Sequence, residues 1–255
     1  MSVDLVMGPW WPVLLGVLGL ILGSFIATLV IRWPQERSVL AGRSQCDGCG
    51  KTLATHELVP VLSAILQRGR CRCCGSAIDP LHWRIELAAG LVGVASGALL
   101  PLPAALAAAV FGWLLLALAA LDITEFWLPD VLTLMLALAG LASWALGIGP
   151  ALADRLIGAA AGFGALWLIG AGYKAWRGRE GLGAGDPKLL GAIGLWLGWR
   201  LLPSVVLVAA MIGLGVFAFR WLTGRAVSRV DPQPLGALLA IAAYPAEILM
   251  LRLGL

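Results

Sequence analysis

The sequence predicts an all-α polytopic membrane protein with about eight transmembrane helices and a small polar domain inserted after the first helix. Hydrophobic residues make up 60% of its 255 residues and charged residues only 13%. Soluble domains are about half apolar and about a quarter charged. The apolar residues are gathered in eight long runs, and all five cysteines fall in one polar insertion. A chain of this composition belongs in a bilayer.

The eight runs are the expected membrane helices, because a helix needs about 20 predominantly apolar residues to cross the hydrocarbon core. They lie at residues 9–31, 83–100, 103–121, 128–148, 151–173, 187–202, 203–222 and 234–253. The sixth run is short, and only Pro203 separates it from the seventh, so a count of seven is the alternative to eight. Gly and Ala are frequent in the runs, as is typical of helices that pack closely in lipid.

The distribution of Lys and Arg predicts the orientation of the chain. With eight spans and the N-terminus outside, all but three of the 18 Lys and Arg residues lie on the cytoplasmic side; the exceptions are Arg155, Arg200 and Arg252. Short loops rich in these residues stay in the cytoplasm. The topology accounts for the net charge of +4, so we expect the lipid bilayer and no nucleic acid as a partner.

Three segments follow from this pattern: a first transmembrane helix (1–31), a cytoplasmic domain (32–82) and a transmembrane domain (83–255). A domain of about fifty residues buries little core and commonly needs a metal or disulfides to fold. Thiols on the cytoplasmic side stay reduced, which argues against disulfides. A metal is therefore the expected stabiliser of the 32–82 domain.

The cysteines form two C-x-x-C pairs, Cys46 with Cys49 and Cys71 with Cys74. Two such pairs can supply four thiolates to a tetrahedral zinc ion at about 2.3 Å, and four sulfur ligands leave no position for water, so the zinc is expected to be structural. A glycine follows each pair and eases the tight turn around a metal. Cys73 is a spare thiol that could replace Cys71 or Cys74, and unligated thiols are the other alternative.

Two aspartates lie at predicted helix ends on the cytoplasmic side. Asp122 ends the third apolar run and Asp186 begins the sixth. Ionisable groups at the edge of membrane helices are candidates for function, because burying them is costly. The structural alternative is helix capping: Asp186 before Pro187 is a normal helix start, and Asp130 has the same interpretation.

The surroundings of the two aspartates favour a catalytic pair. Gly183 and Gly185 precede Asp186 and leave the backbone bare, so that a substrate chain can approach it closely. Asp122 and Asp186 lie at opposite ends of their helices, and the helix dipoles therefore act on them in opposite senses. One carboxyl group would serve as acid and the other as base, as an aspartic protease requires.

Several motifs together resemble the type IV prepilin peptidases, which are GxGD-type membrane aspartic proteases. The resemblance rests on Gly-Leu-Gly-Ala-Gly-Asp ending at Asp186, on Asp122 eight residues before Asp130, and on the two cysteine pairs. It extends over nearly the whole chain and includes Gly-Ser-Phe at 23–25, Val-Pro-Val-Leu-Ser at 59–63, and Glu86.

The resemblance implies a bifunctional leader peptidase and N-methyltransferase of the bacterial inner membrane, multi-pass, with its active site facing the cytoplasm. Its substrates would be prepilins or pseudopilins of a type IV pilus or a type II secretion system. Asp122 and Asp186 map onto the catalytic aspartates, and the cysteine pairs onto the family's cysteine tetrad. The resemblance also implies methylation of the new N-terminus with S-adenosylmethionine, in the 32–82 loop; the cofactor-binding residues stay unassigned.

Two other function classes account for part of the pattern. A proton-coupled transporter would carry carboxylates near the middle of facing helices, whereas only Glu86 and Glu247 approach that placement and both are expected to be structural. A non-catalytic, zinc-containing scaffold of a secretion system would tolerate Asn in place of Asp122, which an aspartic protease would not.

Overall fold

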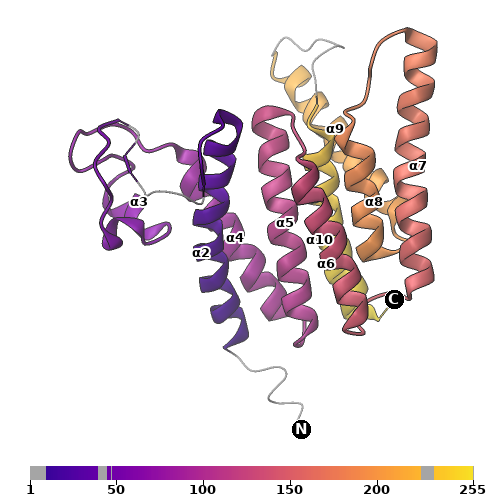
Figure 1. Cartoon of the computed structure of the whole chain (residues 1–255), viewed down its shortest axis with the longest axis horizontal. Coiled ribbons are helices and arrows are strands. Elements are labelled where there is room, and N and C mark those ends of the chain that lie inside the picture. Colours follow the sequence, from indigo (N-terminus) through magenta and orange to yellow (C-terminus); the bar gives the residue numbers. More distant parts are fainter. Residues whose placement is uncertain (1–9, 40–44, 47, 225–232, 255) are drawn as a thin grey trace. The chain divides into compact units, whose positions relative to one another are not determined.

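The computed structural model describes residues 10–39, 45–46, 48–224 and 233–254. The chain divides into two compact units, Met1–Leu102 and Pro103–Leu255. The described residues form α-helices, short 3-10 helices and irregular segments, with two isolated β-bridges (Figure 1). The predicted all-helical fold is confirmed.

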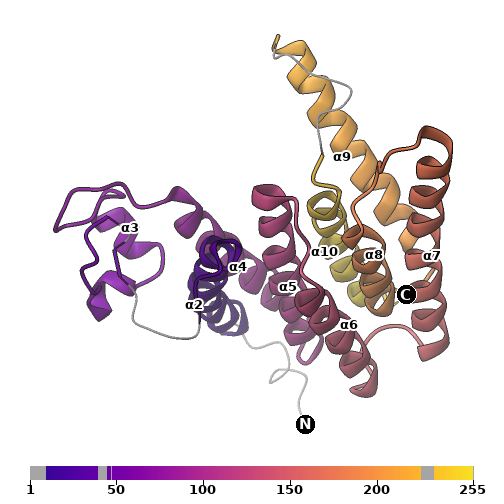
Figure 2. The ribbon, with the colours of Figure 1, turned by 45° about the horizontal axis from the view of Figure 1, so that its top comes forward.

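The first unit is built on two long helices, α2 (Trp11–Arg32) and α4 (Pro80–Leu99), which lie side by side (Figure 2). The segment between them carries η1 (Trp33–Gln35), η2 (Thr55–Leu58) and α3 (Leu62–Leu66). This segment contains the cysteines, so the polar insertion expected after the first helix is present.

Glycine allows α2 and α4 to touch backbone to backbone. A Cβ atom on Gly19 would lie 2.2 Å from the Ala89 carbonyl oxygen, and one on Gly93 would lie 2.0 Å from that of Leu15. No side chain fits at either distance. The close helix packing predicted from the small residues is therefore confirmed for α2 and α4.

The second unit is a bundle whose successive helices run in alternating directions (Figure 1). Its helices are α5 (Ala104–Glu125), α6 (Asp130–Ala145), α7 (Leu152–Arg177), α8 (Gly185–Leu197), α9 (Leu202–Leu222) and α10 (Leu235–Leu253). As a result, the end of α5 and the starts of α8 and α10 lie at the same end of the bundle.

Helix α8 lies in the interior of this unit, and most of its residues are buried. It approaches α7 through glycine, since a Cβ on Gly194 would lie 2.4 Å from the carbonyl oxygen of Gly158. Near its C-terminus, the Trp196 indole donates a hydrogen bond to the Leu136 carbonyl oxygen at 2.8 Å and stacks at a tilt on Phe111. These contacts fix α8 between α5, α6 and α7.

Arg155 closes the opposite end of the bundle from the start of α8. It is 1% exposed, and its guanidinium donates to the carbonyl oxygens of Gly140 at 2.8 Å and Leu195 at 2.5 Å. It also bonds the Ile148 carbonyl and interacts electrostatically with the buried Glu247 of α10. Glu247 therefore lies in the electrostatic field of Arg155, although its Oε2 has no hydrogen-bond partner among the described residues; its expected structural role stays a prediction.

Each of the eight predicted apolar runs is occupied by one helix. Within the part of the chain that the structure describes, five helices are long and apolar enough to cross a membrane: α2, α5, α7, α9 and α10. Helix α6 is apolar but has 16 residues, and α8 has 13. The chain is a multi-pass membrane protein, and the count of eight spans stays a prediction.

The compact units differ from the segments expected from the sequence in the place of α4. Helix α4 packs on α2, so the chain divides after Leu102, whereas the sequence grouped residues 83–255 together on apolar character alone. The functional segments 1–31, 32–82 and 83–255 stay a prediction. Of the polar segments expected on the cytoplasmic side, the one before α10 lies largely outside the described residues.

Candidate active site and cysteine cluster

Asp122 and Asp186 lie at the same end of the second unit, at positions set by where their helices stop and start. Asp122 is in the last turn of α5, which ends where Phe126 takes a left-handed φ of 51°. Asp186 is in the first turn of α8. Both are buried, with 5% and 6% of their surface exposed. The structure thus brings together two carboxyl groups that the sequence separates by more than sixty residues.

The two aspartates line one cavity of about 270 Å³, and their carboxyl groups interact electrostatically. Trp127 and Leu128, from the segment that follows α5, form an apolar part of its wall, and Gly183 and Gly185 form another part. All four residues predicted for the site therefore surround one cavity. Their catalytic roles stay predictions.

The glycines before Asp186 are needed for space. A Cβ on Gly183 would lie 3.0 Å from Asp186 Oδ2, and one on Gly185 would lie 2.7 Å from Leu128 Cβ. A side chain at either position would press on the carboxylate or on the cavity wall. The approach of a substrate chain at these glycines stays a prediction.

The start of α10 is a part of the site that the sequence analysis missed. The backbone N–H of Ala237 donates a hydrogen bond to Asp122 Oδ2 at 2.8 Å, and a Cβ on Gly236 would lie 3.0 Å from the same oxygen. The first N–H groups of a helix have no partner within it and are free to bind an acid. Pro234 followed by Gly236 marks this helix start in the sequence, but nothing local indicates that Asp122 is its acceptor.

Because of this contact, the expectation that opposite helix ends distinguish the two aspartates is wrong in its simple form. Asp122 lies at the C-terminus of α5 and also faces the N-terminus of α10. Two helix dipoles of opposite sense act on it, so the dipole of α5 alone does not decide its role.

The capping alternatives are also wrong. Pro129 is the N-cap residue of α6, and the Asp130 carboxylate pairs instead with Lys188 of α8 at 2.6 Å. Helix α8 begins at Gly185, and no side chain makes a capping hydrogen bond at its start. Asp186 is therefore a buried carboxyl group of the cavity and not a cap.

The four predicted metal ligands form a cluster in the first unit. The Sγ atoms of Cys46, Cys49, Cys71 and Cys74 all lie within 4.8 Å of one another, and those of Cys46 and Cys74 are 3.8 Å apart. Sulfur atoms about 2.3 Å from a tetrahedral zinc ion lie about 3.8 Å apart. The cluster therefore fits a metal ion bound by four thiolates.

The two cysteine pairs repeat one backbone arrangement. The N–H of Gly50 donates to the Cys46 carbonyl at 2.8 Å, and the N–H of Gly75 donates to the Cys71 carbonyl at 2.9 Å. Both glycines take a positive φ, of 68° and 72°. The tight turns that the sequence predicted after each pair are thus present, and each folds its two thiols toward the same point.

The geometry also decides between the cysteines. Cys73 is exposed and is not part of the cluster, whereas Cys71 is buried. A hydrogen bond with the Ser76 hydroxyl, followed by backbone N–H groups of Cys49 and Gly48, lowers the pKa of Cys46 to about 6. A thiol of low pKa readily forms the thiolate that binds metals.

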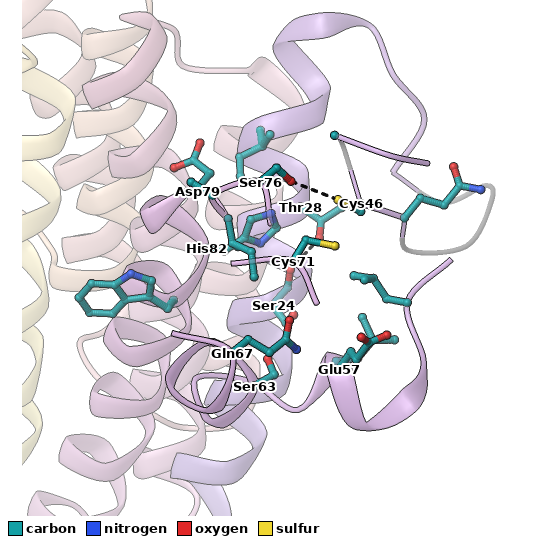
Figure 3. Close-up of a pocket in the computed structure, with 18 of the residues that line it drawn as sticks. Ser24, Thr28, Cys46, Glu57, Ser63, Gln67, Cys71, Ser76, Asp79 and His82 are labelled. Carbon is teal, nitrogen blue, oxygen red and sulfur yellow. Dashed lines mark hydrogen bonds between the residues drawn. The ribbon is translucent and has the colours of Figure 1, made fainter. Parts of the chain in front are cut away.

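A second cavity, of about 160 Å³, lies beside the cysteine cluster in the first unit (Figure 3). Ser24 and Thr28 of α2 line it, as do His82 and Glu86 of α4 and Cys71 of the cluster. The cavity is therefore enclosed by both long helices and by the insertion between them. The sequence analysis assigned no residues to such a cavity.

One wall of this cavity is held by an unusual backbone turn. Val61 has φ 60° and ψ −48°, and the Leu62 N–H reaches the Pro60 carbonyl at 2.6 Å. A positive φ is unfavourable for a β-branched residue and persists only where the surroundings enforce it. The Val61 N–H donates to Glu86 Oε2 at 2.7 Å, so the carboxylate of α4 holds the turn in place.

Comparison with known proteins gives matches over both units. The bacterial peptidase A24 N-terminal domain matches residues 17–99, and the type IV leader peptidase family matches residues 109–218. A prepilin leader peptidase/N-methyltransferase of Burkholderia pseudomallei is 42% identical over 250 residues, which cover 88% of this chain and 81% of the relative. One of Pectobacterium carotovorum is 37% identical over 254 residues, 91% of each chain. No solved structure matches.

Zinc analysis tests the cysteine cluster. We expect about one zinc ion per chain in protein purified without chelator, since four thiolates bind zinc tightly. Cys71→Ser should lose the metal and lower the amount of folded protein. Cys73→Ser is the matched control, because Cys73 is exposed and lies outside the cluster, and it should keep the metal. Zinc-free wild-type protein, or equal loss of zinc in both variants, would refute the assignment.

Gly236→Ala tests the contribution of α10. The new methyl group would crowd Asp122 Oδ2 and Leu128, so turnover on a leader peptide should fall on the order of tenfold or more while the protein still folds. Gly215→Ala in α9 is the control, since a Cβ there meets nothing within 4 Å. If the two variants cleave the peptide equally fast, the start of α10 does not position Asp122.

Proposed function

Because the chain belongs to the type IV leader peptidase family, we propose that it removes the leader of prepilins or pseudopilins with Asp122 and Asp186 as its catalytic pair. The observation that carries this assignment is the single cavity shared by two buried carboxyl groups from different helices. An aspartic protease uses two carboxyl groups that share one site. The enzyme is a multi-pass protein of the inner membrane.

The chemistry follows from what two carboxyl groups can do together. One carboxylate removes a proton from a water molecule as its oxygen attacks the scissile carbonyl carbon, and the second, protonated carboxyl donates a hydrogen bond to the carbonyl oxygen. The tetrahedral intermediate then collapses, and a proton passes to the leaving amine. Asp122 is positioned by Ala237 and Asp186 by the first turn of α8, so both are held before the substrate arrives.

The cavity wall suits an extended peptide chain. Gly183 is exposed and lies beside Asp186, so a substrate strand can approach its backbone closely. Trp127 and Phe126 add apolar surface to the lining of the same cavity. A leader joined to a hydrophobic helix presents both features, a backbone to be cut and an apolar segment to be held.

The metal is assigned to the first unit. We propose that Cys46, Cys49, Cys71 and Cys74 hold one structural zinc ion, which supplies folding free energy to an insertion that has little core of its own. With four thiolate ligands it has no free position for a substrate. The proposed zinc ion therefore has no catalytic role in either cavity.

Methylation of the new N-terminus is the second activity, in line with the relatives named prepilin leader peptidase/N-methyltransferase. We place it in the first unit, where the cavity between α2, α4 and the insertion offers an enclosed site that the peptidase chemistry does not use. The methyl donor would be S-adenosylmethionine. The two reactions would then use separate cavities, each within one compact unit.

Both sites are proposed to face the cytoplasm. The support is the distribution of Lys and Arg, which are concentrated in the insertion and in the segments at the aspartate end of the second unit. Lys174 and Arg177 lie in the last turn of α7, and Lys188 lies in the first turns of α8. The three remaining cations lie at the other end of the bundle: Arg155 in α7, Arg200 before α9 and Arg252 in the last turn of α10.

The catalytic pair is tested by Asp122→Asn and Asp186→Asn. Asn resembles Asp in shape but cannot take up a proton at neutral pH, so each variant should lose about 10²- to 10⁴-fold in leader cleavage. Cleavage is measured as the mobility shift of a prepilin substrate in detergent, with enzyme abundance followed in parallel.

The matched control is Glu180→Gln, which changes an exposed acid near the same end of the unit that pairs with Lys174. It should cleave at the wild-type rate. Asp130→Asn is not a suitable control, because Asp130 lines the cavity and pairs with Lys188. If either Asp122→Asn or Asp186→Asn processes the substrate fully, the two aspartates are not the catalytic pair. A scaffold function would then be favoured.

The orientation is tested with reporter fusions. A reporter that works only in the cytoplasm should be active after Arg179, between α7 and α8, and alkaline phosphatase should be active after Gly149, between α6 and α7. Active alkaline phosphatase after Arg179 would place the aspartates outside and overturn the shared cytoplasmic location.

A further inference from the structure

Glu86 is a buried carboxylate with an incomplete set of partners. It is 7% exposed and lines the cavity of the first unit. Its Oε2 accepts the N–H of Val61 at 2.7 Å, while in the described part of the chain no Lys or Arg lies within ion-pair distance of it. Arg32 also lines the cavity but forms no ion pair with Glu86.

Glu57, the other buried acid that lines this cavity, has both a hydrogen-bond donor and a cation as partners. Glu57 is 8% exposed, accepts the N–H of Ala54 at 2.9 Å and lies 3.7 Å from Lys51 Nζ (Figure 3). Glu57 therefore has a cation from the protein. Glu86 is about equally buried, but it accepts its hydrogen bond from a neutral backbone N–H, and the side chain faces the cavity.

A buried carboxylate without a counter-ion is costly, and buried charges in proteins are normally paired with a cation or a metal. The cost at Glu86 is reduced if a positively charged ligand occupies the cavity. The alternative, that Glu86 serves only to hold the Val61 turn, would need no charge, because the amide oxygen of Gln accepts the same hydrogen bond.

We propose that Glu86 binds the organic cation that methyl transfer brings into this cavity: the ammonium group of the peptide's new N-terminus or the sulfonium group of the methyl donor. The inference rests on the proposed methyltransferase function and assigns it a binding residue. In each ligand a single positive charge is centred on one atom, nitrogen or sulfur. A carboxylate can form a favourable charge–charge interaction with either.

The reaction keeps a positive charge in the cavity throughout. The terminal ammonium first loses a proton to water, and the lone pair of the neutral amine attacks the methyl carbon of the sulfonium. The new C–N bond forms as the C–S bond breaks, and the electron pair of that bond stays on sulfur as a neutral thioether. The product is a methylated ammonium group, so the charge moves from sulfur to nitrogen and a carboxylate can accompany it.

The placement of Glu86 suits this role. It lies one helical turn from His82 on α4, and both side chains line the cavity together with Ser24 of α2. Because the Val61 N–H fixes one carboxylate oxygen, the carboxyl group is oriented before a ligand enters. A preoriented charge binds its ligand with less loss of side-chain freedom.

The test uses the full chain in detergent and two pairs of ligands that differ only in charge. One pair is a leaderless peptide with a free or an acetylated N-terminus, and the other is S-adenosylmethionine or its neutral thioether, S-adenosylhomocysteine. Wild-type protein should prefer the charged member of at least one pair by about tenfold or more. Glu86→Gln should lose that preference, and the pair in which it is lost identifies the cation.

Two further variants separate charge from shape. Glu86→Asp keeps the charge and should retain a reduced preference, whereas Glu36→Gln, an exposed acid outside the cavity, should behave as wild type. All three variants should cleave the leader at the wild-type rate. Because leader cleavage does not depend on methylation, this rate shows that each variant is folded.

If Glu86→Gln keeps the wild-type preference in both pairs, or if Glu86→Asp loses it as fully as Glu86→Gln, the proposal is overturned while the peptidase and methyltransferase assignments stand. If wild-type protein cleaves leaders but transfers no methyl group to the leaderless peptide, the methyltransferase function fails, and the role of Glu86 fails with it.

Discussion

A polar group removed from water costs free energy unless it finds a partner within the protein, and this requirement shapes both units. Asp122 takes the free N–H of Ala237 at the start of α10. Glu247 lies in the field of Arg155, whose guanidinium is occupied by the backbone carbonyls of neighbouring helix ends. Glu86 takes the N–H of Val61 and otherwise faces a cavity. Asp122 and Glu86 thus join distant segments through backbone N–H donors, whereas Glu247 keeps one oxygen, Oε2, without a hydrogen-bond partner among the described residues.

The requirement also explains how a site at one end of a bundle is held accurately. Helix α8 carries Asp186 at its start, and at its other end Trp196 and the carbonyl of Leu195 are bound by α6 and by Arg155. Close contact with α7 at Gly194 prevents it from moving sideways. A catalytic carboxyl group needs this support, because small displacements of reacting groups cost large factors in rate.

Long apolar runs, cysteine spacing and the aspartate motifs predicted the helices, the metal cluster and the aspartate pair, because each is encoded in a short stretch of sequence. The contacts between distant segments could not be predicted in this way. Asp130 was interpreted as a cap but pairs with Lys188, 58 residues away in sequence. The donor from α10 to Asp122 is 115 residues away in sequence, and only the packed bundle brings it there.

The central claim is that one cavity in the second unit, lined by Asp122 and Asp186, is where the leader is cut. The most direct measurement is an experimental structure of the Asp122→Asn variant with an uncleaved prepilin leader peptide bound. The account predicts that the scissile peptide bond lies between residues 122 and 186, with the chain extended along Gly183 and Gly185. A leader bound elsewhere, with its scissile bond out of reach of both residues, would contradict it.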